Sequence, residues 1–218
     1  MNTLTSKPLA LLLDHLFSEA DAATSPALKS MPKDERNRLL KSKTEYLQFY
    51  SLVKDLWLPV SRETGSLLYL MARNSQATSI VEFGTSFGIS TLYLAAALRD
   101  NGGGRLITTE FEPSKVARAR RNLEEAGLAD LVDVREGDAL QTLAQNLPAT
   151  IDLLLLDGAK ALYGEILDLL ESRLRPGALI IADDADQNPD YLARVRSTGG
   201  GYVSLSFGDD VELSLRTD

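Results

Sequence analysis

Cysteine is absent from the 218-residue sequence, and histidine occurs once, at position 15. Without thiols the chain has no disulfide framework, no cysteine nucleophile and no cysteine-ligated metal site. No apolar run reaches the ~18 residues that a membrane-spanning helix needs. Asp14 and His15 interrupt the apolar segment KPLALLLDHLF. We therefore expect neither a secretory signal nor a membrane partner, and a cytoplasmic location is the default expectation.

Basic residues are the minority among the charges, with 23 lysines and arginines against 31 acidic residues and a net charge of -8. This balance disfavours a general nucleic-acid or anionic-membrane binder. The basic run KVARARRNLEEAG is interpreted as the solvated face of a helix. The 44% hydrophobic content is typical of a globular protein with a substantial core. The expected partner is a small-molecule acceptor, with no nucleic acid.

The chain divides into two parts at about residue 77. Segments such as KPLALLLDHLFSEA and SRETGSLLYLMAR repeat their apolar residues at helical spacing. The run MPKDERNRLLKSKTEYLQFYSLVKDLWL is also interpreted as helical, with a break at Pro59. We therefore expect residues 1–77 to form a helical extension that covers a pocket or a second copy, and residues 78–218 to form the main domain.

From Thr78 onward, short β-rich runs alternate with helical segments. The β-rich runs are TSIVEF, RLITTEF, LVDVREG, IDLLLLD and ALIIAD. Such alternation indicates parallel strands joined by right-handed helical crossovers. The final runs YVSLSF and VELSLR are separated by three residues, as in a β-hairpin. The expected fold class is α/β, a doubly wound seven-stranded, mostly parallel sheet with a C-terminal hairpin.

The segment SIVEFGTSFGIST joins the first of these strands to a helix. Gly84 and Gly88 allow the backbone to approach a ligand closely at that turn. Their G-x-x-x-G spacing differs from the dinucleotide fingerprint G-x-G-x-x-G, and no Lys-Ser or Lys-Thr pair follows as in a P-loop. Glu82 precedes the turn, where a carboxylate would repel a pyrophosphate and attract a cationic ligand.

Two further acidic residues follow the next two expected strands. Glu110 ends the second strand, about where an acid accepts hydrogen bonds from ribose hydroxyls. Asp138 follows the third strand beside the same crevice, where it could accept a hydrogen bond from an adenine amino group. A nucleoside that carries a positive charge and no phosphate has the chemistry of S-adenosylmethionine.

The motifs VEFGTSFGIST, TTEFEPSK and REGDAL resemble those of class I S-adenosylmethionine-dependent methyltransferases. The segment DLLLLDGAKALYGEILDLLESRLRPGALIIADDAD resembles the divalent-metal O-methyltransferases of the catechol and caffeoyl-CoA group. The resemblance covers roughly Pro59 to Asp186. It implies a cofactor site made of the following residues: Val60, Glu82, Gly84, Ser86, Ser90, Glu110, Asp138, Ala139 and Asp157.

Three carboxylates end the fourth and fifth strands, at one rim of the expected crevice. They belong to Asp157, Asp183 and Asp184. Carboxylates this close repel one another unless a cation is present, and Mg²⁺ prefers such oxygen ligands. The resemblance implies a metal held at these positions by Asp, Asp and Asn. Asp184 replaces the Asn and adds a negative charge, which leaves open a tighter site, another metal preference or another use.

Lys160 stands three residues after Asp157, and the resemblance implies that these two residues act in catalysis. The matching lysine of the family helps to remove the proton of the attacking hydroxyl. The expected reaction is transfer of a methyl group from S-adenosylmethionine to a hydroxyl of a catechol-like molecule. Alternatives are a metal-independent methyltransferase, a non-catalytic S-adenosylmethionine-binding module, an aminopropyltransferase and, disfavoured by the glycine spacing, an NAD-dependent oxidoreductase.

Several other conspicuous residues have ordinary structural interpretations. Tyr163, Trp57 and Tyr50 are expected to pack rather than react, and His15 is expected at the surface. A helical segment of about 75 residues exceeds what one sheet needs for cover. We therefore expect the extension to contact a second copy of the chain in a homodimer.

Overall fold

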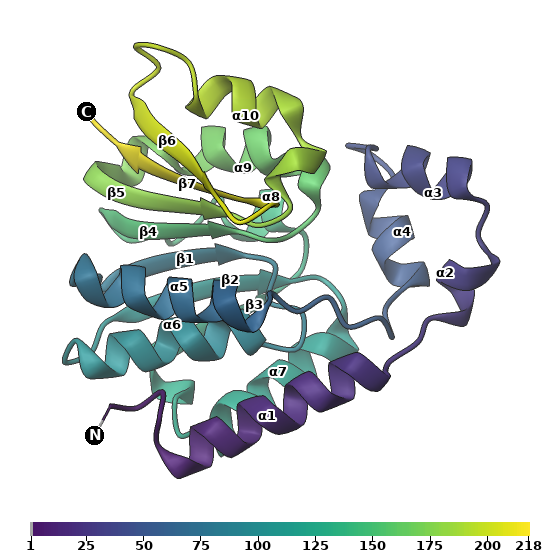
Figure 1. Ribbon diagram of the computed structural model, residues 1–218, viewed down its shortest axis with the longest axis horizontal. Helices are drawn as coiled ribbons and strands as arrows, with labels where there is room; N and C mark the ends of the chain where they lie inside the picture. The colour runs from purple at the N-terminus through teal and green to yellow at the C-terminus, as the bar shows by residue number, and fades with distance from the viewer. Residues whose placement is uncertain (1) are drawn as a thin grey trace.

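A computed structural model describes residues 2–218 as a seven-stranded sheet with helices on both faces (Figure 1). The strands follow the order β3-β2-β1-β4-β5-β7-β6. Their bounds are β1 (Ser79–Phe83), β2 (Arg105–Glu110), β3 (Val132–Glu136), β4 (Ile151–Leu156), β5 (Leu174–Ala182), β6 (Tyr202–Phe207) and β7 (Val211–Arg216). The first five strands are parallel, whereas β7 pairs antiparallel with both β5 and β6. The predicted fold class is confirmed.

Helices connect the parallel strands and bury both faces of the sheet. Their bounds are α6 (Ile89–Asp100), α7 (Pro113–Glu125), α8 (Ala139–Thr142), α9 (Tyr163–Leu170) and α10 (Pro189–Val195). Alternate strand residues point to opposite faces, so Leu153 and Leu155 pack with α6, whereas Leu154 and Leu156 pack with α9. This double burial explains why β4 is a nearly continuous leucine run instead of an alternating pattern.

The chain reverses its direction across the sheet between β1 and β4. From β1 the connections run outward through β2 to β3, and β4 then returns to the other side of β1. Ligands of doubly wound sheets bind at such a switch point, beyond the carboxyl ends of the strands. The switch point therefore brings the glycine turn after β1 next to Asp157, which follows β4.

Five helices precede the sheet: α1 (Lys7–Ala22), α2 (Pro26–Ser30), α3 (Lys33–Leu40), α4 (Tyr46–Leu52) and α5 (Arg62–Asn74). The apolar side chains of α1, among them Leu12 and Leu16, join the same core cluster as Leu68 of α5 and the helix α6. Helices α1 and α5 are therefore layers of the sheet's own core. The long helical run expected after residue 31 is interrupted between Leu40 and Tyr46.

Helices α2, α3 and α4, here called the outer helices, stand apart from the sheet and face the carboxyl ends of its strands (Figure 1). They are held together by a separate small cluster in which Leu39, Phe49 and Val53 are buried. One ion pair, from Lys43 to Glu165, joins them to α9. The outer helices consequently form a wall opposite the strand ends instead of a further layer on the sheet.

The two edges of the sheet differ in charge. The outer strand β3 carries Asp133, which pairs with Arg135 of the same strand and with Arg105 of β2. The opposite edge strand β6 is uncharged and exposes Val203, Leu205 and Phe207. Between residues 2 and 218, no helix combines the length and apolar character that crossing a bilayer requires.

Candidate active site

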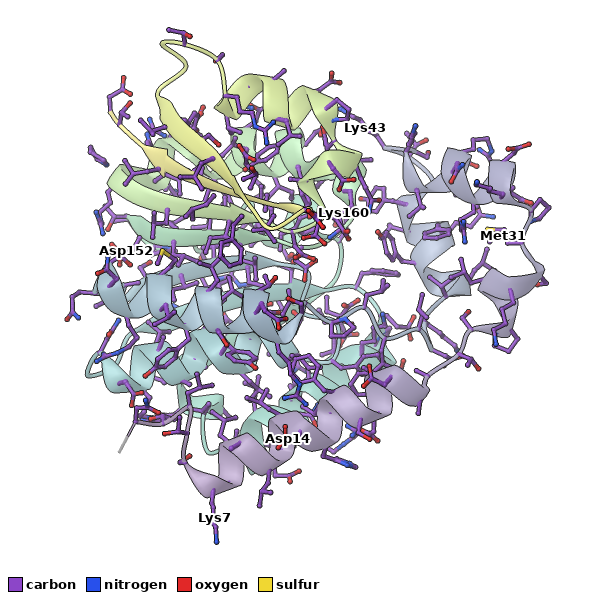
Figure 2. The ribbon with its side chains drawn as sticks, in the orientation of Figure 1. Lys7, Asp14, Met31, Lys43, Asp152 and Lys160 are labelled. Carbon is purple, nitrogen blue, oxygen red and sulfur yellow. The ribbon has the colours of Figure 1, made fainter. Side chains whose placement is uncertain are left out.

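A cavity of about 410 Å³ lies between the strand ends and the outer helices. This volume falls in the range of small-molecule sites. Predicted site residues that line it are Gly84, Ser86, Glu110, Ala139, Asp157, Lys160, Asp183 and Asp184. Figure 2 shows Lys160 at the strand ends, on the side that faces the outer helices. The switch point thus gathers residues from the ends of five strands into one space.

The glycine turn after β1 is shaped by contact with the neighbouring loop. Gly84 adopts φ +105°, and a Cβ atom there would lie 2.6 Å from the backbone oxygen of Asp157. Gly158 is equally confined, because a Cβ atom would lie 2.5 Å from the Phe83 ring. Only glycine fits both positions. The turn and the loop after β4 therefore touch along their backbones, and side chains cannot fill the cavity floor.

Glu110, at the end of β2, is placed at the cavity by two backbone hydrogen bonds. Its Oε2 accepts from the amide of Ser86 and its Oε1 from the amide of Glu112, each at 2.9 Å. Burial raises the pKa of this carboxyl despite the two amides and the nearby Lys115 ammonium. Each oxygen retains lone pairs, so the carboxylate can still accept hydrogen bonds from a ligand hydroxyl.

Glu82 lies behind the glycine turn and does not line the cavity. Its side chain is fully buried and accepts hydrogen bonds from Ser90 Oγ at 2.5 Å and Thr91 Oγ1 at 2.6 Å. Burial raises the pKa of Glu82 to about 7, although both hydroxyls favour the ionised form. Glu82 thereby ties the end of β1 to the first turn of α6. Ser90 and Val60 line a small space that adjoins the main cavity.

Asp138 caps helix α8, accepting a hydrogen bond from the amide of Leu140 at 3.0 Å. The neighbouring Gly137 and Ala139 line the cavity, whereas the side chain of Asp138 lies beside Tyr46 of the outer helices. Burial and the Asp138 carboxyl together raise the pKa of the Tyr46 hydroxyl. The loop after β3 thus contributes the backbone of Gly137 and the methyl group of Ala139 to the cavity. The Asp138 carboxyl lies where this loop meets the outer helices.

Asp157 and Lys160 form a buried ion pair at the centre of the site. Lys160 Nζ donates to Asp157 Oδ1 at 2.8 Å and lies 3.3 Å from Asp184 Oδ2. Only 11% of the lysine side chain and 10% of the Asp157 side chain are exposed. Burial lowers the pKa of Lys160, but the surrounding carboxylates outweigh burial and hold its pKa well above the ordinary value. Lys160 is therefore an ammonium in this arrangement.

Asp183 and Asp184 complete the acidic rim. Burial and the Asp157 charge raise the pKa of Asp183 to about 8. Tyr163 is fully buried, and its hydroxyl donates to the backbone oxygen of Asp183 at 2.6 Å, so this side chain supports the loop after β5. Asp184 adopts a left-handed conformation with φ 51°. Asn and Asp tolerate this conformation better than other non-glycine residues, so backbone geometry restricts the choice here.

The donor set of these three aspartates suits a hard divalent cation, because it offers only carboxylate oxygens. Among residues 2–218, however, no three acidic or histidine side chains are gathered tightly enough to form a metal-ligand group. The ammonium of Lys160 lies between Asp157 and Asp184 instead. The residues fit a divalent cation chemically, provided that the lysine side chain gives way.

Several cavity residues have no counterpart in the sequence-based site. Lys115 is 5% exposed, lines the cavity and lies over the Phe87 ring, with its pKa lowered by burial. Phe87 stacks on Trp57 with ring centroids 3.9 Å apart. Tyr50 packs against the core as expected, but it also lines the cavity. In the sequence, Lys115 stands five residues after Glu110, in the first turn of the helix that follows the second strand. That position near a strand end was the available signal for a cavity role.

Known proteins with similar sequences are methyltransferases. Residues 81–185 match the family model described as a methyltransferase domain. The catechol O-methyltransferase of Niastella koreensis is 38% identical over 138 residues, 62% of this chain and 62% of the relative. That of Mycobacterium tuberculosis is 35% identical over 160 residues, 73% of this chain and 67% of the relative. The chain belongs to the O-methyltransferase family that contains catechol O-methyltransferase.

Among solved members of the wider O-methyltransferase fold, TomG from Streptomyces achromogenes was crystallised with S-adenosylmethionine. TomG superposes on this chain with a TM-score of 0.65 and 27% sequence identity. The superposition covers 92% of this chain and 99% of TomG. The resemblance recognised in the sequence motifs is thus confirmed. The alignments span about two thirds of the length of the first catechol O-methyltransferases.

Proposed function

We propose that this chain transfers the methyl group of S-adenosylmethionine to a hydroxyl of a small, catechol-like acceptor. The observation that carries the proposal is the shared cavity, in which Gly84 and Glu110 lie next to Asp157 and Lys160. A nucleoside end and a reacting end would thereby share one space. Family membership supports the reaction type, since both aligned relatives are catechol O-methyltransferases.

The cofactor would occupy the side of the cavity formed by the ends of β1, β2 and β3. Glu110 would accept hydrogen bonds from the ribose hydroxyls, because its carboxylate is already fixed by two backbone amides. The glycine turn would lie along the methionine portion, where side chains are excluded. Asp157 lines both the main cavity and the adjoining space, so it connects the cofactor side with the reacting side.

The reaction is an in-line displacement at the sulfonium methyl group. The acceptor oxygen forms a bond to the methyl carbon, the carbon–sulfur bond breaks, and the electron pair leaves with sulfur to give S-adenosylhomocysteine. The acceptor hydroxyl must lose its proton, which would pass to solvent water while Lys160 is an ammonium, because an ammonium cannot accept a proton. Lys160 as an ammonium would stabilise the resulting phenolate by charge and orient it. The site chiefly supplies alignment, because the two reactants are held in one cavity.

A divalent metal at Asp157, Asp183 and Asp184 is part of the proposal. When bound, it would acidify the acceptor hydroxyl and offset the carboxylate charges. The same offset would lower the pKa of Lys160, which the carboxylates now raise, and would let its amine accept the proton. A metal-independent methyltransferase is the second candidate, favoured by the position of the Lys160 ammonium between Asp157 and Asp184.

The deciding experiment supplies purified protein with S-adenosylmethionine and catechol, and detects methylated product by mass spectrometry. We expect product with Mg²⁺ and little product in EDTA. Equal product in both conditions would favour the metal-independent candidate. Tight cofactor binding without product from catechols would favour a non-catalytic binding module.

The homodimer and the cytoplasmic location remain predictions of the sequence. The described core includes α1 and α5, so the segment available for a second copy is smaller than the sequence suggested. Light scattering at micromolar concentration tests the dimer, which a mass of 23.8 kDa would contradict.

A further inference from the structure

Arg36, on α3 of the outer helices, is a cavity residue whose side chain has no protein partner within residues 2–218. It is half-buried and lines the cavity. Across residues 2–218, no hydrogen bond or ion pair involves its side chain, whereas Arg38 on the same helix pairs with Glu45 and Lys43 pairs with Glu165. Arginine is almost never fully buried without a partner, and Arg36 is partly withdrawn from solvent with none. The cavity wall formed by the outer helices therefore carries a positive charge that no described side chain pairs with.

The other two cations that line the cavity are accompanied by acids. Lys160 contacts Asp157 and Asp184. Lys115 lies in the field of Glu110 and Glu112, both of which raise its pKa against the effect of burial. Arg36 is therefore the cavity cation whose charge the described chain leaves without a close carboxylate, and a ligand carboxylate would supply it.

The surface around Arg36 is apolar and aromatic. Neighbouring cavity residues on the outer helices include Leu28, Leu40, Tyr46, Phe49, Tyr50 and Val53. Such side chains suit a flat aromatic ring. The strand-end wall opposite holds three aspartates, Asp157, Asp183 and Asp184, against one lysine that is already paired with two of them, so it would still repel an anionic group. An acceptor with an anionic end would thus enter with that end directed away from the strands.

We infer that the acceptor is a vicinal dihydroxy aromatic carboxylate, whose carboxylate binds Arg36 while its hydroxyls meet the Lys160 end of the cavity. The guanidinium can hold a carboxylate through two parallel hydrogen bonds. The inference rests on the proposed function, because it names the substrate class of the same site. Arg36 acts as a specificity residue and does not touch the reacting atoms.

The experiment compares 3,4-dihydroxybenzoate, neutral catechol and cationic dopamine as acceptors, with saturating S-adenosylmethionine. Wild type, Arg36→Gln and Arg36→Lys are measured. Arg38→Gln is the matched control, because it removes the same charge from the same helix without lining the cavity. Each variant's thermal transition establishes that the sheet core remains folded, and its resistance to proteolysis within residues 26–52 establishes the same for the outer helices.

Arg36→Gln should lower kcat/KM for 3,4-dihydroxybenzoate by roughly 10- to 100-fold, mainly through KM, because a charge-assisted contact is lost. Catechol should change by less than about 3-fold, and Arg36→Lys should recover part of the loss. Arg38→Gln should match wild type for all three acceptors. Equal losses for benzoate and catechol, or no loss, would overturn the inference.

Two further outcomes distinguish the inference from the proposed function. If no acceptor is methylated, the proposed function fails, and the Arg36 site is then tested by calorimetric binding of 3,4-dihydroxybenzoate to protein loaded with S-adenosylhomocysteine. Binding lost in Arg36→Gln would support the inference, and unchanged binding would reject it. Weaker S-adenosylmethionine binding in Arg36→Gln would mean that Arg36 serves the cofactor carboxylate instead.

Discussion

The two walls of the cavity are built differently. The strand-end wall is charged, and its side chains are fixed by backbone hydrogen bonds and close glycine contacts, as at Glu110 and Gly84. The outer helices line the cavity mostly with apolar side chains and depend on a small cluster around Phe49 and Val53. This difference indicates a division of labour in which the sheet carries the reaction and the outer helices choose the acceptor.

The attachment of the outer helices reinforces this contrast. One ion pair, Lys43 to Glu165, connects them to α9, and exposed ion pairs contribute little to stability. The following segment is anchored more firmly, because Trp57 stacks on Phe87 within the glycine turn. Tyr46 of α4 also joins the core cluster on the α9 face of the sheet, so the outer helices are attached both there and beside the turn that we expect to hold the cofactor.

The largest effect is expected at Asp157. Asp157→Asn removes the carboxylate that pairs with Lys160 and lines both cavity spaces. Methyl transfer should fall by roughly 100-fold or more, because alignment and charge at the reacting centre are lost together. Product formation is measured under saturating substrates. Asp168→Asn, which removes an exposed acid on α9, is the control and should leave the rate within about 2-fold.

The next largest effect is expected from Glu110→Ala, which removes the proposed ribose acceptor. S-adenosylmethionine affinity should fall by about 1–3 kcal/mol, because ligand hydroxyls lose a charged partner. Calorimetric titration gives the dissociation constant directly. Glu136→Ala, an exposed acid at the end of β3, serves as control. Unchanged affinity for Glu110→Ala would remove the cofactor from this side of the cavity.

Glu82 supplies a pH-dependent effect of similar size on stability. Its folded pKa of about 7 lies above the ordinary value of 4.5, because the carboxyl is buried. The folded state therefore binds the proton more tightly, and stability is lost as pH rises from about 4.5 to about 7, by on the order of 3 kcal/mol. Above pH 7 this contribution is constant.

Glu82→Gln cannot titrate, so its free energy of unfolding should fall less than that of wild type between pH 5 and pH 8. Urea unfolding at several pH values measures the difference, in which the contributions of other acids cancel. Parallel curves for the two proteins would mean that Glu82 is already ionised in the folded state at pH 5.

The smallest overall effect is expected in the outer helices. Phe49→Ala removes a buried ring from their own cluster, so residues 26–52 should become more sensitive to proteolysis and to hydrogen exchange. The acceptor KM should rise by about 3- to 10-fold, while S-adenosylmethionine affinity stays unchanged. Leu68→Ala in the sheet core should instead lower the melting temperature of the whole domain. If Phe49→Ala lowered the melting temperature as much as Leu68→Ala, the outer helices and the sheet core would unfold as one cooperative unit.

Much of the sheet wall could be predicted from sequence because its signals are local. Each strand is a short apolar run, and residues such as Glu110 and Asp157 stand at strand ends, which the switch-point rule gathers at one edge. The hairpin was evident from two β-rich runs around a three-residue turn. The position of Glu82 was less predictable, because strand alternation alone did not distinguish a buried carboxyl behind the turn from one in the cavity.

The outer helices could not be placed from sequence, because their arrangement depends on long-range contacts. A helical pattern around Leu39 and Phe49 does not reveal whether those residues pack on the sheet or on each other. The cavity role of Arg36 follows only from that placement. Likewise, the sequence suggested a metal to relieve the clustered carboxylates, whereas the structure shows that Lys160 already provides one positive charge there.

Lys160→Met gives the most direct test of the claim that the strand-end wall carries the reaction, because it keeps the side chain's bulk but removes its charge from the reacting end. We predict that S-adenosylhomocysteine affinity, measured by calorimetry, stays within about 3-fold of wild type. Single-turnover methyl transfer to catechol should fall by roughly 100-fold or more. A rate near that of wild type, or a loss of cofactor affinity as large as the loss of rate, would contradict the account.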